Sequence, residues 1–285
     1  MGDRAFYRHY LLLAVPMILQ NAITNLVSFL DNIMVGQLGT EQMSGVAIVN
    51  QLIFVYNLAI FGAVSAASIF GAQYFGNGDH RGHMHSFRFK LYATLLVSGL
   101  TMLLLLTKGS DLISLYLTDT AGNGATDVAL QYGKQYLVIM LVGLVPFAVN
   151  QAYATNIKET GQTLVPMLAS FVAVGTNAVL DYLLIFGVGP FPELGVTGAA
   201  LATVIARYVE AVIVVFWAHR NREKNRYLEG AYRGFGIPVS ELKTVLIKGL
   251  PLMFNEVLWA AGMTTVTQCY SVRGLDVVAG LNIAT

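Results

Sequence analysis

The chain has 285 residues, of which 55% are hydrophobic and only 12% charged, and its formal net charge is +1. Soluble domains carry about a quarter charged residues, so this composition and a mean hydropathy of +0.61 exclude an ordinary soluble protein and predict an all-α integral membrane protein. The nearly neutral charge offers no basic surface for nucleic acid, and the single Cys269 excludes an intrachain disulfide.

Seven apolar stretches have the roughly 17–25 residues that a helix needs to cross a bilayer. The first follows Arg4 and Arg8 and exceeds twenty residues without a small-residue cleavage site, so we expect a retained helix rather than a signal peptide. The predicted spans are 10–36, 46–74, 88–107, 131–156, 162–187, 194–218 and 245–270, with 275–285 beginning an eighth.

Most basic residues fall in alternate connections between these spans. They occur in the amino terminus, the 75–90 connection, the 157–161 turn and above all the 219–248 segment. The positive-inside rule therefore predicts a cytoplasmic amino terminus and a cytoplasmic linker. We divide the chain into a six-helix lobe (1–218), a basic linker (219–244) that we interpret as a solvated loop, and the start of a second lobe (245–285).

The first span carries a long polar stripe. At 100° per residue its polar side chains lie within an arc of about 140°. A stripe of this kind either forms hydrogen bonds between helices or lines a hydrated cavity, and an acid at its end favours the cavity because an ionisable group at the bilayer centre costs roughly 2.5–3.5 kcal/mol. The members are Gln20, Asn21, Thr24, Asn25, Ser28, Asp31 and Asn32.

A second polar face lies on the fifth span, where Thr163, Ser170, Asn177 and Asp181 fall within about 40° of one another. A carboxylate one turn from an amide offers oxygen ligands to a small cation such as Na⁺, and a partly desolvated carboxyl can instead take up a proton. The alternative is a carboxylate held in a structural hydrogen bond.

Charged residues also occur in the sixth and seventh spans. Arg207 and Glu210 are three residues apart, which predicts an ion pair on one helix face, and Thr203 lies four residues before Arg207. Glu256 follows Pro251 by five residues without a nearby basic partner, so it is either a second functional carboxylate or a hydrated residue at the membrane edge.

Motifs for other functions are missing from the sequence. His80, His83 and His85 lie in a basic, glycine-containing connection without cysteine, which favours a solvated loop over a metal site. A GK[ST] phosphate loop, an HExxH motif and a Ser/His/Asp arrangement are also lacking, so we expect neither ATP as the energy source nor an enzyme.

Residues 246–285 repeat the layout of residues 11–50 at an offset of 235 positions. Pro16, Gly39 and Gly45 recur as Pro251, Gly274 and Gly280. Such a restart predicts a two-lobe repeat protein whose second lobe is only begun here. Asp31 corresponds to Val266, so we expect the lobes to share shape but not chemistry.

Four segments together resemble the multidrug and toxic compound extrusion (MATE) family: PMILQNAITNLVSFLDNIMVGQLG (16–39), GAVSAASIFGAQYFGNGD (62–79), NAVLDYLLIFG (177–187) and GVTGAALAT (195–203). The resemblance implies two six-helix lobes in a plasma-membrane antiporter. Such transporters expel amphipathic organic cations by alternating access in exchange for Na⁺ or H⁺, with no other cofactor. This chain would hold the first lobe, a seventh helix and the beginning of an eighth.

The resemblance also assigns site residues. The family's first-helix carboxylate corresponds to Asp31, its Asn and Asp pair to Asn177 and Asp181, and its sixth-helix hydroxyl to Thr203. Glu256 matches a seventh-helix glutamate of one branch, whereas Tyr182 replaces the proline of many relatives. The implied partners are the bilayer, the drug cations, and the rest of the second lobe or a second copy of the chain.

Two other functions remain open from the sequence. A flippase for lipid-linked saccharides belongs to the same superfamily. Such a flippase should have several basic residues along its cavity, whereas in this sequence Arg207 is the only basic residue well inside a predicted span. A non-transporting membrane fragment is the second alternative, because the later helices of a second lobe are not in this sequence.

Overall fold

The computed structural model describes residues 4–117, 125–233 and 236–271, and this part of the chain is helical apart from short connections. The predicted eighth span, 275–285, lies outside the described residues. The helices are α1 (Arg4–Gly36), α2 (Thr40–Gly76), α3 (His80–Ser114), α4 (Ala125–Val142), α5 (Leu144–Glu159), α6 (Leu164–Phe186), α7 (Val196–Arg220), the 3₁₀ helix η1 (Arg226–Leu228) and α8 (Val239–Ser271).

The predicted membrane fold is confirmed in its class. Within the described residues α2, α3, α6 and α7 are long and apolar enough to cross a membrane, and α4 with α5 forms a fifth span if the bent pair is counted as one. Each predicted stretch from 10–36 to 245–270 coincides with helix. The count of six spanning helices in the first lobe stays a prediction.

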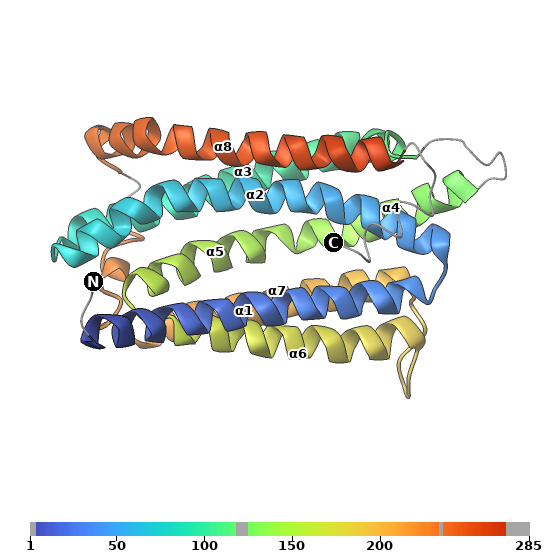
Figure 1. The fold of residues 1–285 in the computed structure, drawn as a ribbon, viewed down its shortest axis with the longest axis horizontal. Helices are drawn as coiled ribbons and strands as arrows, with labels where there is room; N and C mark the ends of the chain where they lie inside the picture. The colour runs from blue at the N-terminus through green and yellow to red at the C-terminus, as the bar shows by residue number, and fades with distance from the viewer. Residues whose placement is uncertain (1–3, 118–124, 234–235, 272–285) are drawn as a thin grey trace.

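The long helices run side by side as a bundle (Figure 1). Helix α8 lies along α2 on one side, α1 packs against α6 and α7 on the other, and α4 and α5 run between these groups. One apolar core surrounds Tyr56, Tyr136 and Leu144 in the centre of the bundle, and a second surrounds Phe87 and Tyr153 at one end. Polar residues in the bundle interior must therefore find partners among other side chains.

Small residues bring α2 and α4 into close contact. A Cβ atom added to Gly45 would lie 2.5 Å from the carbonyl oxygen of Ala129 and 2.9 Å from the backbone nitrogen of Gly133. Backbones approach this closely only where side chains are absent, which is a common arrangement between membrane helices. This contact holds α4 close to the first turns of α2.

The predicted span 131–156 is not one straight helix. Helices α4 and α5 meet at Gly143 with a bend of 45°. Pro146 has no N–H to donate and its ring clashes with the carbonyl four residues earlier, Val142, so a continuous helix is disfavoured there. The bend leaves the Gly143 carbonyl available to a neighbouring helix.

The histidine-containing connection is shorter than the sequence suggested. Asp79 caps α3 by accepting hydrogen bonds from the backbone nitrogens of Arg81 (3.1 Å) and Gly82 (3.0 Å), so the helix begins at His80. The expectation of a solvated loop is wrong for His83, which is 2% exposed and lies one turn into the helix.

A buried charge cluster joins α3 to α5 at the same end. His83 Nε2 lies 3.2 Å from Glu159 Oε2, and Lys90 forms a salt bridge with the same carboxylate. Lys90 Nζ also donates to Asn156 Oδ1 at 3.3 Å. The side chains of Lys90 and Glu159 are 0% and 6% exposed, so each buried charge requires the opposite charge of the other. Lys90 therefore stabilises the fold and is not a solvated loop residue that sets the membrane topology.

The linker is packed against the first lobe for part of its length. Arg88 donates four hydrogen bonds of 2.6–3.0 Å to the carbonyl oxygens of Gly230, Ala231, Arg233 and Gly236, an arrangement that we call the Arg88 clamp. Aromatic contacts reinforce it. The Tyr153 and Tyr232 hydroxyls are hydrogen-bonded, and the Tyr232 ring stacks on His219 with centroids 5.8 Å apart. The expectation of a fully solvated linker is therefore wrong for 227–231, where three residues are buried.

Candidate functional site

The two predicted carboxylates face each other from α1 and α6. Asp181 is 1% exposed, Asp31 is half-buried, and the two are close enough to interact electrostatically. In each of them Oδ1 is buried and has no hydrogen-bond partner among the described residues. An unsatisfied buried acceptor costs about 1–3 kcal/mol, and more when it is charged. The pair is therefore suited to take up a cation or a proton.

Helix α7 completes the group that the sequence predicted. Asn177 Nδ2 donates to Thr203 Oγ1 at 3.5 Å, and Asn177 also interacts with the Asp181 carboxylate one turn later on α6. The four residues that the resemblance assigned to the first six helices thus lie together, drawn from α1, α6 and α7. Their oxygen atoms are the ligand type that hard cations prefer.

Tyr136 of α4 belongs to the same group, and sequence reasoning missed it. It is 1% exposed, its hydroxyl donates to Asn50 Oδ1 at 3.2 Å, and it interacts with Asp31, Asp181 and Thr203. A tyrosine inside an apolar span resembles ordinary packing, so Tyr136 gave no signal of its own. Asn50 and Asn57 lie two turns apart on α2, and this spacing could have indicated a polar face on that helix.

The polar stripe of α1 also contacts α6 at a second position along the helix. Gln20 Nε2 donates to Ser170 Oγ at 2.6 Å, and Ser170 Oγ donates to Glu210 Oε1 at 2.5 Å. These two hydrogen bonds link α1, α6 and α7. Thr24 instead donates to the Gln20 carbonyl at 2.9 Å along its own helix.

Other members of the stripe are not brought into this group. Asn21, Thr24 and Asn25 are exposed in the structure. Ser28 lies on α1 and Glu256 on α8, but the side chains of both fall outside the described part of the structure. The roles predicted for these residues stay predictions.

The expected ion pair between Arg207 and Glu210 is wrong. Arg207 Nη1 donates to the Gly143 carbonyl at 3.4 Å, and its guanidinium carbon lies 5.1 Å from the centre of the Phe147 ring. The bend between α4 and α5 supplies this acceptor, while Ser170 occupies Glu210. Spacing along α7 could not reveal either competitor.

Helix α8 contacts the lobe through α2. The rings of Phe54 and Trp259 lie 6.0 Å apart between centroids, and Gln51 Nε2 donates to Thr264 Oγ1 at 3.5 Å. Among the described side chains of α8, Phe254 and Leu258 are exposed. An apolar helix with one side uncovered is consistent with further protein or lipid beside it.

Comparisons with known proteins agree with this arrangement. The MatE family model matches residues 16–183. A protein of Thermotoga maritima named "Probable multidrug resistance protein NorM" is 26% identical over 273 residues, which is 95% of this chain and 56% of that protein. The protein of the same name from Rhizobium meliloti is 30% identical over 224 residues, 78% of this chain and 46% of its own length.

Solved structures share the fold. An inward-facing conformation of a multidrug resistance MATE family transporter of the MOP superfamily matches with a TM-score of 0.75 at 23% identity, over 97% of this chain and 60% of that one. An outward-facing conformation matches with a TM-score of 0.77 at 22% identity, over 95% and 58%. The chain therefore spans about 60% of these proteins.

Proposed function

This chain belongs to the MatE family, and from that premise we propose that it forms the cation-binding lobe of a transporter that exports amphipathic organic cations in exchange for Na⁺ or H⁺. The names of its relatives, multidrug resistance proteins and MATE transporters, support this cargo. We further propose a multi-pass location in the plasma membrane with the amino terminus in the cytoplasm.

The observation that carries the proposal is the pair of unsatisfied carboxylate oxygens on Asp31 and Asp181. Two buried carboxylates close together repel one another unless a positive charge lies between them or one takes up a proton. With the neighbouring oxygens of Asn177 and Thr203, the pair supplies enough hard ligands for Na⁺. The same geometry serves a shared proton, so both coupling ions remain in the proposal.

Cation uptake would change the shape of the lobe through α1. Neutralising the pair lowers the cost of removing water from between α1 and α6, and Pro16 interrupts the α1 hydrogen-bond ladder where the helix can bend. A state in which this space closes binds the cation differently from one in which it is open. Differential binding of that kind shifts the equilibrium between inward-facing and outward-facing forms.

Cationic cargo fits this lobe better than the anionic cargo of a saccharide flippase. Arg207 is already engaged by Gly143 and the Phe147 ring, whereas carboxylates face the space beside α1. Aromatic and acidic groups together attract flat organic cations. The remaining helices of the second lobe would close the cavity along α8 and the exposed stripe of α1.

The test is drug efflux from cells that produce the protein. We expect Asp31→Asn and Asp181→Asn each to abolish ethidium efflux, a loss of at least about tenfold, while the protein stays in the membrane at normal levels. The matched control is Asp111→Asn, because Asp111 is an exposed partner of Lys108 on α3. Wild-type efflux by either buried-site variant would overturn the proposal.

A further inference from the structure

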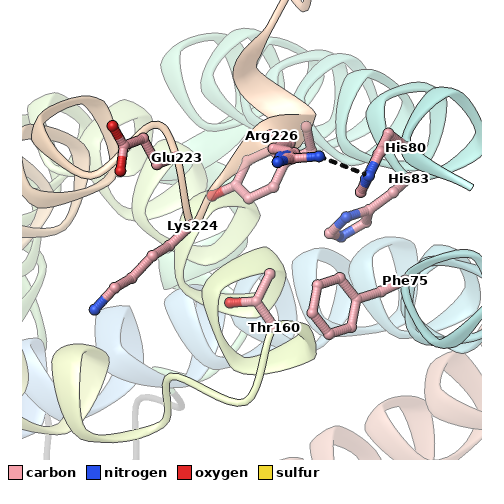
Figure 2. A pocket seen from close by; sticks show the side chains of 8 residues that line it. Phe75, His80, His83, Thr160, Glu223, Lys224 and Arg226 are labelled. Atoms are coloured by element: carbon pink, nitrogen blue, oxygen red, sulfur yellow. Dashed lines mark hydrogen bonds between the residues drawn. The ribbon is translucent and has the colours of Figure 1, made fainter. Parts of the chain in front are cut away.

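A cavity lies at the end of the bundle where the linker returns to the first lobe. Its volume is about 170 Å³, several times the roughly 30 Å³ that a water molecule occupies in the liquid. Three separate segments line it: the junction of α2 and α3, the turn after α5, and the linker before and within η1. The lining residues are Phe75, His80, His83, Thr160, Glu223, Lys224, Arg226 and Tyr227 (Figure 2).

Hydrogen-bond donors without protein acceptors gather here. The hydrogen bond of the Arg226 guanidinium within the described residues joins Nη1 to His80 Nε2 at 3.4 Å, which leaves most of its five N–H donors available to a ligand. The Tyr227 hydroxyl is buried and has no partner among the described residues. Burial raises the pKa of Tyr227 above its ordinary value, which keeps the hydroxyl protonated and able to donate.

The acidic side chains near the cavity either have partners of their own or are directed away from Arg226. Glu159 is held by Lys90 and His83, and Asp79 caps the first turn of α3. Figure 2 shows the Glu223 carboxylate directed away from Arg226, on the opposite side of the cavity from His80 and His83. Figure 2 shows the Lys224 ammonium group also directed away from Arg226, on the side of Glu223, so these two opposite charges offset one another. The positive charge of Arg226 and the donors of Arg226 and Tyr227 favour an anion over a cation.

Contacts around the cavity hold its lining residues in place. The Arg88 clamp fixes the backbone immediately after η1, at Gly230 and Ala231, and the Tyr227 ring packs between His83 and Phe87 with centroids 5.0 Å from each. Arg226 and Tyr227 are thus held against α3 before any ligand arrives. A preorganised donor set loses little conformational entropy on binding.

We propose that this cavity binds a phosphate group at the cytoplasmic face, with Arg226 as the main ligand and Tyr227 as a second donor. A planar guanidinium matches the geometry of phosphate oxygens, and the exposed Phe75 ring offers an apolar wall beside them. The phosphate comes either from an anionic lipid headgroup or from a soluble phosphate compound, because the chemistry of recognition is shared.

Thermal unfolding of the purified protein separates these sources. The lipid arm compares nanodiscs of phosphatidylcholine alone with nanodiscs of equal phosphatidylcholine and phosphatidylglycerol, and the soluble arm titrates inorganic phosphate in phosphatidylcholine nanodiscs. We expect one probe to raise the unfolding midpoint of the wild-type protein. Arg226→Gln should weaken the apparent affinity for that probe at least about tenfold, since hydrogen bonds to a charged group are lost.

Two further variants make the result decisive. Tyr227→Phe removes only the hydroxyl and should weaken binding about threefold to tenfold, and it carries the test if Arg226→Gln does not fold. Arg222→Gln is the matched control, because Arg222 is exposed on the same linker but does not line the cavity, and it should respond as the wild type does. A wild-type protein that responds to neither probe, or cavity variants that respond as fully as Arg222→Gln, would overturn the proposal.

Discussion

At the scale of single residues, the site between α1 and α6 contains groups that lower the stability of the fold. Asp181 is buried beside Asp31, and each carboxylate leaves one oxygen without a partner in the described structure. A protein under selection for stability alone would pair or remove such groups. Their persistence in a packed interior is what distinguishes them from Glu159, whose charge is matched by Lys90 and His83.

Asp181→Asn should therefore raise the thermal unfolding midpoint even though we expect it to abolish efflux. Removing an uncompensated buried charge stabilises the fold by about 1–2 kcal/mol, which corresponds to a rise of about 2–4 °C in a domain of this size. Unfolding in detergent, followed by size-exclusion chromatography of heated samples, measures the shift. The control Asp111→Asn should leave the midpoint unchanged, because exposed ion pairs contribute little. A lower midpoint for Asp181→Asn would contradict this account.

Sequence reasoning identified the carboxylates of the site better than their surroundings. Helical periodicity placed Asn177 and Asp181 on one face and Asp31 at the end of the polar stripe. The family resemblance then assigned these residues and Thr203 to one cation site, and the structure brings all four together. Tyr136 escaped because a tyrosine in an apolar span has no distinctive pattern. Partners on other helices, such as Ser170 for Glu210, depend on packing that periodicity along one helix does not contain.

At the scale of helices, breaks and close contacts position the site. The bend between α4 and α5 at Gly143 provides the carbonyl that engages Arg207, while the contact between Gly45 and Gly133 holds α4 against α2, which carries Asn50. The sequence predicted helix throughout 131–156 correctly but not the bend, since Pro146 near the middle of an apolar stretch is also compatible with a mild kink. Tertiary contacts decide between these outcomes.

Gly45→Ala should destabilise the protein because its new Cβ atom would overlap the backbone of α4. Overpacking of this kind costs about 1–3 kcal/mol. Gly99→Ala is the matched control, since Gly99 lies inside α3 with nothing within 4 Å of the added carbon. Replacing an interior helical glycine there should be neutral or stabilising by up to about 1 kcal/mol. Thermal unfolding of both variants checks the difference, and equal shifts would argue against a tight contact between α2 and α4.

At the scale of the whole molecule, the two ends of the bundle differ in character. One end of the bundle holds the start of α1, the linker and the start of α3 (Figure 1). This end contains buried charges and a cluster of aromatic residues. The basic residues that predict its cytoplasmic position are thus of two kinds. Arg81 and Arg222 are exposed and act by charge, whereas Arg88 and Lys90 are buried and hold the fold together.

Cysteine labelling tests the predicted orientation. After Cys269→Ser, the substitutions Glu193→Cys and Glu223→Cys place single thiols at exposed positions beyond opposite ends of α7. Helix α7 has 25 residues and is about 38 Å long, enough to cross a hydrocarbon core of about 30 Å. A membrane-impermeant maleimide should label position 193 in intact cells and position 223 only in inverted vesicles. The reverse pattern would place the amino terminus outside.

The Arg88 clamp also sets how much free chain connects residues 1–218 to α8. In the sequence the linker has twenty-six residues, 219–244, but the clamp binds the chain to residues 1–218 as far as Gly236, and α8 begins at Val239. Only Ile237 and Pro238 lie between these points, and two extended residues reach about 7 Å. The beginning of α8 is therefore held close to residues 1–218, so we expect any large movement of the predicted second lobe to be a rotation about this short connection rather than a separation.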